Sequence, residues 1–349
     1  MIAKVLKKIS IFLVWFLILE IGSRAILKVK IGLPFFTPEK LLTDVVYPEL
    51  GHIKSNYKPG KEYFNILLLG GSVINHKWSD LENSLEKNVQ GYTNQKVNVY
   101  NLSMPGHNSL DNLVKYELLG DYSFDAVVYY ESINETRVNN IDSIYFKDDY
   151  SHISWYRNYH LFKKHHQLKI SVIPFFLEYI VESIKLKLNQ EKYILEQLIS
   201  LKNFDKVSPL KSTRTFKTNL LKINEIAAKK NEPLILCTYA YYVPLGIKLS
   251  GKVADRKFYS ECSLSTPVTN WGNVENTLKS LQIQNEIIRL VTKQESNVIG
   301  YEVTGDLEVG KLYFCDICHM TPEGNELLSN GISNKIIKEV LGKNVLNEL

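Results

Sequence analysis

Five short apolar runs, separated by longer amphipathic stretches, constrain the fold of this 349-residue chain more than any other feature. The runs are rich in β-branched and aromatic residues and span 64–69, 97–102, 126–130, 234–239 and 298–303. Amphipathic stretches lie between most of them, at 80–89, 110–119 and 274–291. Continuous apolar strands that alternate with helices indicate a parallel sheet covered on both faces. The right-handed crossover rule then predicts a three-layer, flavodoxin-like α/β domain.

One interval breaks this alternation, because no core strand is evident between about residues 141 and 221. Apolar residues at roughly helical spacing mark the segment 181–201: Ile184, Leu188, Leu195 and Leu198. We predict a helical insertion whose apolar face packs on the α/β domain, with a lid or substrate-binding role as the alternative. The predicted domains are an N-terminal membrane anchor or signal segment (1–30), a proline-containing stalk (31–62) and the α/β domain with its insertion (63–349).

The N-terminal segment combines a basic start with an apolar core. Three lysines precede the run ISIFLVWFLIL at 9–19, an order typical of signal peptides and membrane anchors. As a helix this run spans roughly 16 Å, short of the ~30 Å hydrocarbon layer unless Lys8 and Arg24 extend it past Glu20. We predict an N-terminal apolar helix that anchors the chain in a membrane, with the domain on the outer face; a cleaved signal peptide is the alternative.

Charge supports the same assignment. The formal net charge of +5 lies within the first 31 residues, and the remaining residues carry 36 basic and 36 acidic side chains. A balanced domain has no charge-based reason to bind nucleic acid. The predicted partners are therefore a membrane, through the N-terminal helix, and a substrate, but no nucleic acid.

Polar residues or glycines follow four of the predicted strands. In a parallel α/β sheet, ligands bind beyond the carboxyl ends of the strands. These segments are Gly70-Gly71-Ser72 after the first strand, Asn101 to Gly106 after the second, Glu131 to Glu135 after the third, and Asp316 to His319 beyond the fifth.

Together these residues indicate nucleophilic catalysis. Ser72 is a weak nucleophile that needs a base, for which His319 is the candidate. Asp316, three residues earlier, is the candidate carboxylate that fixes the histidine tautomer. The backbone N–H groups of Ser72 and Gly106 and the side-chain amide of Asn134 are the candidate donors to an oxyanion.

These four segments resemble the serine, glycine, asparagine and Asp-x-x-His blocks of the SGNH (GDSL-type) hydrolase superfamily. The sequence HMTPEGN, which begins at His319, is also similar to the C-terminal block of that family. Two departures stand out: Gly71 replaces the aspartate of the GDS form, as in a GGS-type subset, and Ser132 replaces a common glycine. The G-x-S-x-G elbow of α/β-hydrolases is excluded, because Ile74 occupies the position of its second glycine.

The resemblance implies a serine esterase or acyltransferase that works through an acyl-Ser72 intermediate and needs no cofactor or metal. Exported relatives often act on cell-envelope glycans, so a short O-acyl ester of a cell-envelope polysaccharide is the expected substrate. Two alternatives stay open: a lipid esterase or lysophospholipase, and a catalytically silent domain that binds glycans.

The remaining cysteines and histidines carry weaker signals. Cys315 and Cys318 form a C-x-x-C-H pattern with His319, typical of covalent haem attachment, but the same histidine completes the serine constellation. A disulfide between these two cysteines and a pair of free thiols are the open alternatives. His76 is expected at the surface or behind the site, and the His165-His166 pair in a solvated basic patch rather than a metal site.

Overall fold

The computed structural model describes residues 2–139, 141, 143–188, 210–306 and 310–343. The chain divides into two compact units. The N-terminal unit comprises Met1–Ser55 and Asp149–Leu198, and the α/β unit comprises Asn56–Asp148 and Ile199–Leu349.

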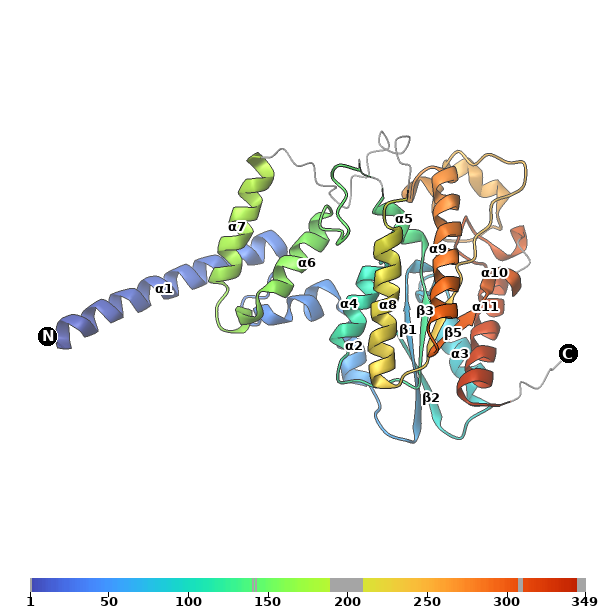
Figure 1. Ribbon diagram of the computed structural model, residues 1–349, viewed down its shortest axis with the longest axis horizontal. Helices are drawn as coiled ribbons and strands as arrows, with labels where there is room; N and C mark the ends of the chain where they lie inside the picture. The colour runs from blue at the N-terminus through green and yellow to red at the C-terminus, as the bar shows by residue number, and fades with distance from the viewer. Residues whose placement is uncertain (1, 140, 142, 189–209, 307–309, 344–349) are drawn as a thin grey trace. The chain divides into compact units, whose positions relative to one another are not determined.

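Five parallel strands form the sheet of the α/β unit in the order β2-β1-β3-β4-β5 (Figure 1). This is the flavodoxin-like order, so the predicted α/β domain with a parallel sheet is confirmed. The strands follow the predicted apolar runs closely: β1 Tyr63–Gly70, β2 Lys96–Asn101, β3 Ala126–Tyr130, β4 Leu234–Cys237 and β5 Val298–Tyr301. All five residues of β3 are buried, as expected for a central strand with both faces covered.

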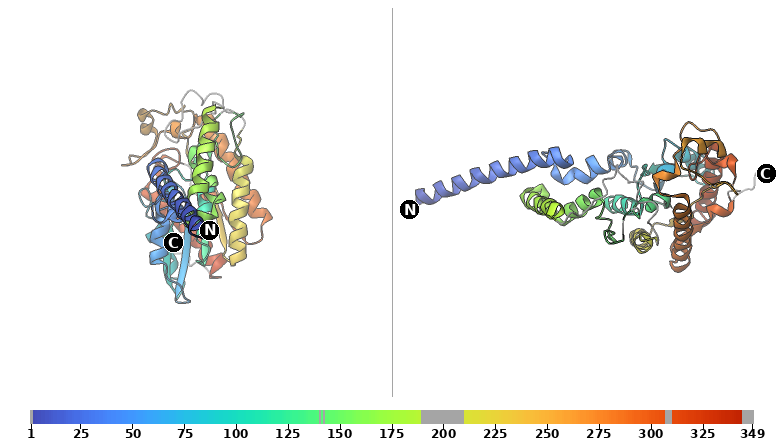
Figure 2. Two further views of the ribbon diagram at one scale, coloured as in Figure 1. Left: turned by 90° about the vertical axis from the view of Figure 1, so that its left-hand side faces the viewer. Right: turned by 90° about the horizontal axis from the view of Figure 1, so that it is seen from above.

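Helices cover both faces of this sheet (Figures 1 and 2). On one face α4 packs against α8 and α8 against α9, while α3 and α11 pack together on the other. The helices are α3 Leu81–Gln90, α4 Ser109–Leu118, α5 Ile133–Arg137, α8 Thr213–Lys230, α9 Val274–Gln294, α10 Val303–Asp306 and α11 Pro322–Lys335. Helix α8 begins inside the range predicted as an insertion, yet it covers the sheet as a crossover between β3 and β4.

The strand order brings the chemistry-bearing loops together. The chain leaves β1 for β2 at one edge and then crosses back to β3, which lies on the other side of β1. Such a reversal opens a crevice beyond the carboxyl ends of the neighbouring strands. The loops after β1, β2 and β3 therefore meet at this end of the sheet.

The N-terminal unit is helical, and its core joins segments far apart in the sequence. Side chains from the predicted anchor and stalk pack with side chains from the predicted insertion: Leu27, Leu33, Leu41, Leu161, Leu168, Val172, Phe175 and Phe176. Leu161 and Phe175 of the predicted insertion thus belong to one core with Leu27 of α1; that the insertion also packs on the α/β domain stays a prediction. The elements are α1 Ile2–Ile31, η1 Pro38–Lys40, η2 Leu41–Val46, α2 Glu49–Asn56, α6 Ser154–Lys164, η4 His166–Lys169 and α7 Ile173–Leu188. Of the predicted stripe, Leu195 and Leu198 lie outside the described residues.

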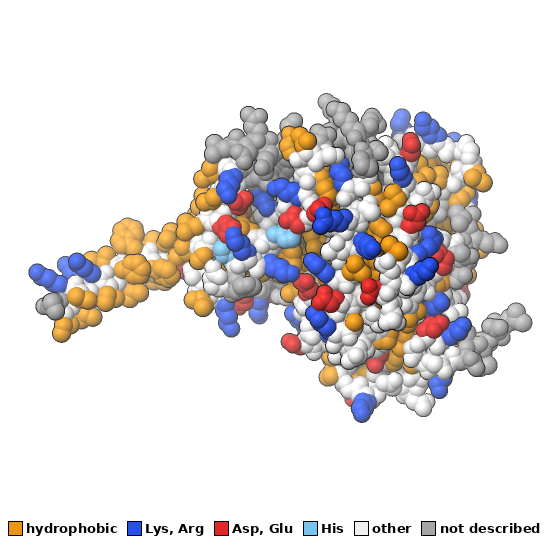
Figure 3. Space-filling view, viewed as in Figure 1, with side chains coloured by type: hydrophobic (Ala, Val, Ile, Leu, Met, Phe, Trp, Pro, Cys, Tyr) orange, Lys and Arg blue, Asp and Glu red, His pale blue; other side chains and the backbone are white. Residues whose placement is uncertain are grey.

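Helix α1 is apolar and exposed over its first two-thirds. Hydrophobic side chains cover it between residues 9 and 19 (Figure 3), and Phe12 and Trp15 are each 67% exposed. Its second part is held by Glu20, which pairs with Arg24 at 2.7 Å and accepts hydrogen bonds from Ser171 and Val172 at the start of α7. Among the described helices, α1 included, none meets the length and apolarity that crossing a membrane requires.

Candidate active site

The loop after β1 presents Ser72 as the first residue of a short 3₁₀ helix, η3 Ser72–Ile74. Gly71 leads into it in an extended conformation with φ −106°. A side chain at position 71 would have no room, because a Cβ atom there would collide with Glu131 Oε2 and lie 2.8 Å from Asn134 Nδ2. The second glycine of the GGS sequence is thus required by close packing against the loop after β3.

Two asparagines fasten the serine loop to the loop after β2. Asn75 Nδ2 donates to the carbonyl oxygen of Ser103 at 2.7 Å, and Asn101 Nδ2 donates to that of Ile74 at 2.7 Å. Each loop thus anchors the other, and this exchange fixes the backbone around Ser72 without help from a ligand.

A continuous chain of hydrogen bonds joins the three predicted catalytic residues. Ser72 Oγ lies 2.8 Å from His319 Nε2, and His319 Nδ1 lies 2.7 Å from Asp316 Oδ2. All three side chains are buried. The turn that brings Asp316 back to His319 is closed by Asp316 Oδ1, which accepts the backbone N–H groups of Cys318 and His319. A serine, an imidazole and a carboxylate in this order can take a proton from the serine hydroxyl and stabilise the resulting cation.

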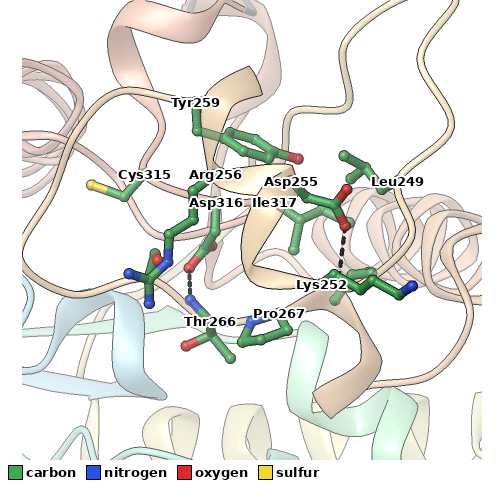
Figure 4. Close-up of a pocket in the computed structure, with 12 residues that line it drawn as sticks. Leu249, Lys252, Asp255, Arg256, Tyr259, Thr266, Pro267, Cys315, Asp316 and Ile317 are labelled. Carbon is green, nitrogen blue, oxygen red and sulfur yellow. Dashed lines mark hydrogen bonds between the residues drawn. The ribbon is translucent and has the colours of Figure 1, made fainter.

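Asp316 is prepared to stay ionised. Burial alone would raise the pKa of its carboxyl, but His319 and the two backbone donors outweigh burial and hold the pKa below its usual value. The backbone N–H of Thr266 also donates to Asp316 Oδ2, at 2.6 Å. Figure 4 shows this bond at the wall of a small cavity of about 30 Å³, which Asp316 lines while it also contacts His319.

Asn134 has its side-chain amide oriented by two groups. Trp271 Nε1 donates to Asn134 Oδ1 at 3.1 Å, which leaves Nδ2 as the donating end of the amide. Nδ2 carries two hydrogens and donates one of them to the carbonyl oxygen of His107 at 3.1 Å. Nδ2 lies beside Gly71, the residue that precedes Ser72.

Gly106 lies in the loop after β2, where its φ of +83° favours glycine. The next residue, His107, is held by Lys115 from α4. Lys115 Nζ contacts His107 Nδ1 at 3.0 Å and donates to the carbonyl oxygen of Leu102, although the lysine side chain is fully buried. The loop that carries Gly106 is thus clamped at both ends by one ammonium group.

Two tryptophans flank the imidazole of His319. The ring of Trp78 stacks on it with centroids 5.2 Å apart, and the ring of Trp271 lies 6.1 Å away. The sequence predicted a role at the site for neither tryptophan. It also assigned no role to Thr266, Glu131 or Lys115. Glu131 stood within a strand-end segment that the sequence did mark as polar; no sequence pattern pointed to the others.

No family model matches this chain, and no curated protein matches it. Several solved structures are similar. A GDSL-like lipase from Bacteroides thetaiotaomicron is 11% identical over 84% of this chain and 96% of its own, with a TM-score of 0.47. A lipase/acylhydrolase from Enterococcus faecalis is 15% identical over 81% and 100%, with a TM-score of 0.43. An acetyl xylan esterase is 10% identical over 78% and 100%, with a TM-score of 0.40.

The cysteines are paired in a way that the sequence did not predict. Cys315 forms a disulfide with Cys262, 53 residues earlier, and Cys318 is a buried free thiol. Neither a Cys315–Cys318 disulfide nor two free thiols is present, because the loop that carries Thr266 brings Cys262 beside Cys315 instead. Burial, with Asp316 nearby, raises the pKa of Cys318 well above its usual value, so it is a neutral thiol. Covalent haem attachment is excluded, since Cys315 is already bonded.

His76 and His165 have surroundings of their own. His76 is exposed, on the wall of a surface groove between α3 and α11. His165 contacts Glu178 at 2.8 Å, and Lys164 contacts the same carboxylate at 2.6 Å. The expected solvated basic patch is therefore neutralised in part by an acid from α7.

Proposed function

We propose that the chain is a serine hydrolase of the SGNH type that cleaves acyl esters through an acyl-Ser72 intermediate. The observation that carries this proposal is the hydrogen-bonded chain from Ser72 through His319 to Asp316. Asp316 is a buried, ionised carboxylate at one nitrogen of His319, and the other nitrogen contacts the Ser72 hydroxyl. A domain that only binds a ligand has no need for this arrangement.

In this mechanism Ser72 Oγ attacks the ester carbonyl carbon while His319 Nε2 takes the hydroxyl proton. Asp316 stabilises the imidazolium that forms. The carbonyl oxygen becomes an oxyanion, which we assign to the Ser72 and Gly106 backbone N–H groups and to Asn134 Nδ2. His319 then protonates the departing alcohol oxygen. Water, or a second alcohol in the case of acyl transfer, attacks the acyl-enzyme by the reverse of these proton transfers.

Covalent labelling tests this function directly. We expect a fluorophosphonate to add one phosphonyl group to the protein at Ser72 and to block turnover of p-nitrophenyl acetate. The Ser72→Ala variant should neither label nor turn over, while its unfolding profile stays that of the wild type. Absence of labelling in the folded wild-type protein would refute the proposal and leave the silent glycan-binding domain as the alternative.

For the substrate we propose a short acyl ester on a sugar, as in an O-acylated cell-envelope polysaccharide. The support is the polar composition of the loops around Ser72, which carry amides and short polar side chains, most of them buried: Asn75, Asn101, Ser103, Asn108 and Asn134. Each buried methylene contributes about 0.8 kcal/mol, so a site that binds long acyl chains should gain rate steeply with chain length. A polar crevice should not.

A chain-length series distinguishes this substrate from a lipid. We expect kcat/KM for p-nitrophenyl esters to peak at acetyl to butanoyl and to fall toward decanoyl. A steady rise to decanoyl would replace the glycan ester by a lipid ester. Release of acetate from an O-acetylated glycan, compared with transfer of the acetyl group to an added glycan, separates hydrolysis from acyl transfer.

We also propose that the protein is held at a membrane by α1, with the α/β unit on the outer, oxidising side. The exposed apolar residues at 9–19, preceded by Lys4, Lys7 and Lys8, support membrane attachment. The Cys262–Cys315 disulfide supports an oxidising compartment. Flotation of the full chain with anionic vesicles tests the attachment: Phe12→Lys/Phe16→Lys should abolish it. Equal flotation of wild type and variant would refute it.

A further inference from the structure

Glu131 is a buried acid that the proposed mechanism does not use. It directly follows β3 and precedes α5, and only 1% of its surface is exposed. Its Oε1 accepts the backbone N–H of Asn134 at 2.7 Å. Its Oε2 has no hydrogen-bond partner among the described residues, and it lies against Gly71. One carboxyl group therefore touches both loops that flank the oxyanion position.

We propose that Glu131 is a positioning residue that sets the oxyanion donors at the distance the reaction needs, an inference that rests on the proposed function. Through Oε1 it fixes the backbone of Asn134, and through Oε2 it forms the wall on which the Gly71–Ser72 backbone rests. Asn134 is thereby held from three sides, by Glu131 at its main chain and by Trp271 and the His107 carbonyl at its amide.

The charge state of Glu131 suits this role. Burial raises the pKa of its carboxyl well above the usual value, and Glu135 raises it further, while hydrogen bonds from Asn134 and from the Ser132 backbone offset this only in part. Among the described residues, Tyr129, Tyr239 and Cys318 also interact with Glu131, and these three groups are not cations. A neutral acid can accept the Asn134 N–H without placing a negative charge beside the oxyanion, where like charges would repel.

A double-mutant cycle tests whether Glu131 acts through Asn134. Asn134→Ala should lower kcat by roughly 10²–10³, the scale for one preorganised oxyanion donor. Glu131→Leu, which removes the acceptor and keeps the volume, should lower kcat by about 10–100-fold and leave KM nearly unchanged. When Glu131→Leu is added to Asn134→Ala, kcat should fall little further, because Glu131 acts through the Asn134 amide that this background lacks. A fully additive loss would overturn the proposal.

Two further variants separate positioning from general stability. Glu131→Gln is neutral and keeps the acceptor oxygen, so its kcat should stay within about threefold of the wild type; a loss as large as that of Glu131→Leu would overturn the proposal. Glu232→Leu is the matched control. Glu232 is a buried acid before β4, where it accepts hydrogen bonds from Tyr116 and Phe124. Its loss should reduce stability but leave kcat unchanged.

A readout independent of turnover keeps the inference distinguishable from the proposed function. Hydrogen exchange of the Asn134 backbone amide should be faster in Glu131→Leu than in the wild type and unchanged in Glu131→Gln. If the wild type shows no ester turnover, the proposed function fails, and the exchange rates alone decide whether Glu131 holds Asn134. Should Glu131→Leu not fold, Gly71→Ala replaces it. Its Cβ pushes on the same carboxyl, and it should lower kcat at least tenfold alone but not in the Asn134→Ala background.

Discussion

Two histidines lie beside the same crevice, and they meet groups of opposite charge at Nδ1. His319 faces the carboxylate of Asp316, and His107 faces the ammonium group of Lys115. The carboxylate accepts the Nδ1 hydrogen of His319 and leaves Nε2 facing Ser72, whereas the ammonium group of Lys115 opposes a proton on Nδ1 of His107. Burial together with Lys115 lowers the pKa of His107 to about 4. The comparison contrasts an imidazole that lies between a carboxylate and a serine hydroxyl with one that burial and an ammonium group keep as a neutral structural acceptor.

The largest expected effect on this comparison comes from a change at Asp316. Asp316→Asn keeps the size of the side chain but removes its charge and favours the wrong tautomer of His319, so we expect kcat to fall by about 10⁴-fold with KM little changed. Steady-state kinetics on p-nitrophenyl acetate measure this. His107→Gln, the matching change at the other histidine, should cost less than tenfold. Comparable losses in the two variants would contradict the division of roles.

The next largest expected effect is a loss of stability when the disulfide next to Asp316 is removed. The disulfide beside it closes a loop of 53 residues with Cys262, and Cys262→Ser/Cys315→Ser should lower the free energy of unfolding by about 4 kcal/mol. Urea unfolding measures the loss. Dithiothreitol should bring the wild type to the level of the variant and leave the variant unchanged. Equal stability of the wild type with and without reductant would argue against the bond.

Removing Lys115, which contacts His107, should reduce the free energy of unfolding somewhat less than removing the disulfide. Lys115→Met leaves the carbonyl oxygen of Leu102 without its ammonium donor, and we expect a loss of about 2–3 kcal/mol in unfolding free energy. Lys229→Met is the control, because Lys229 pairs with Glu225 on the surface, and such pairs contribute little. If the two variants unfold at the same urea concentration, Lys115 does not clamp the loop.

The smallest expected effect is a dependence of stability on pH. Because folding lowers the pKa of His107 from 6.5 to about 4, the unfolded chain binds more protons between these values. Stability is therefore complete above pH 6.5 and falls as the pH drops toward 4, by about 1–2 kcal/mol for a partly exposed ring. Asp316, whose pKa is lowered, loses its contribution only in more acidic solution, below its usual value near 3.8. In His107→Gln the melting temperature should depend less on pH between 6.5 and 4.5 than in the wild type. An unchanged dependence would mean that other groups cause the loss of stability in this pH range.

The sequence was most informative where one residue type has few chemical uses. Apolar runs located all five strands, and the strand ends located Ser72, Asn134, Asp316 and His319. Lys115 was not foreseen because a lysine within an amphipathic helix normally faces solvent, and its contacts with Leu102 and His107 come from the tertiary structure. Trp271 and Cys262 belong to a long segment without periodicity, so their partners, Asn134 and Cys315, follow from the tertiary structure alone.

Ser72 and His319 are 247 residues apart in the chain. Closing a loop of that length costs conformational entropy before any contact repays it, so this pair forms late when the protein refolds. Helix signals report on local structure, which forms early. Recovery of ester turnover after dilution from denaturant should therefore lag behind recovery of circular dichroism. The length of this delay measures when the last loops of the α/β unit reach their native positions.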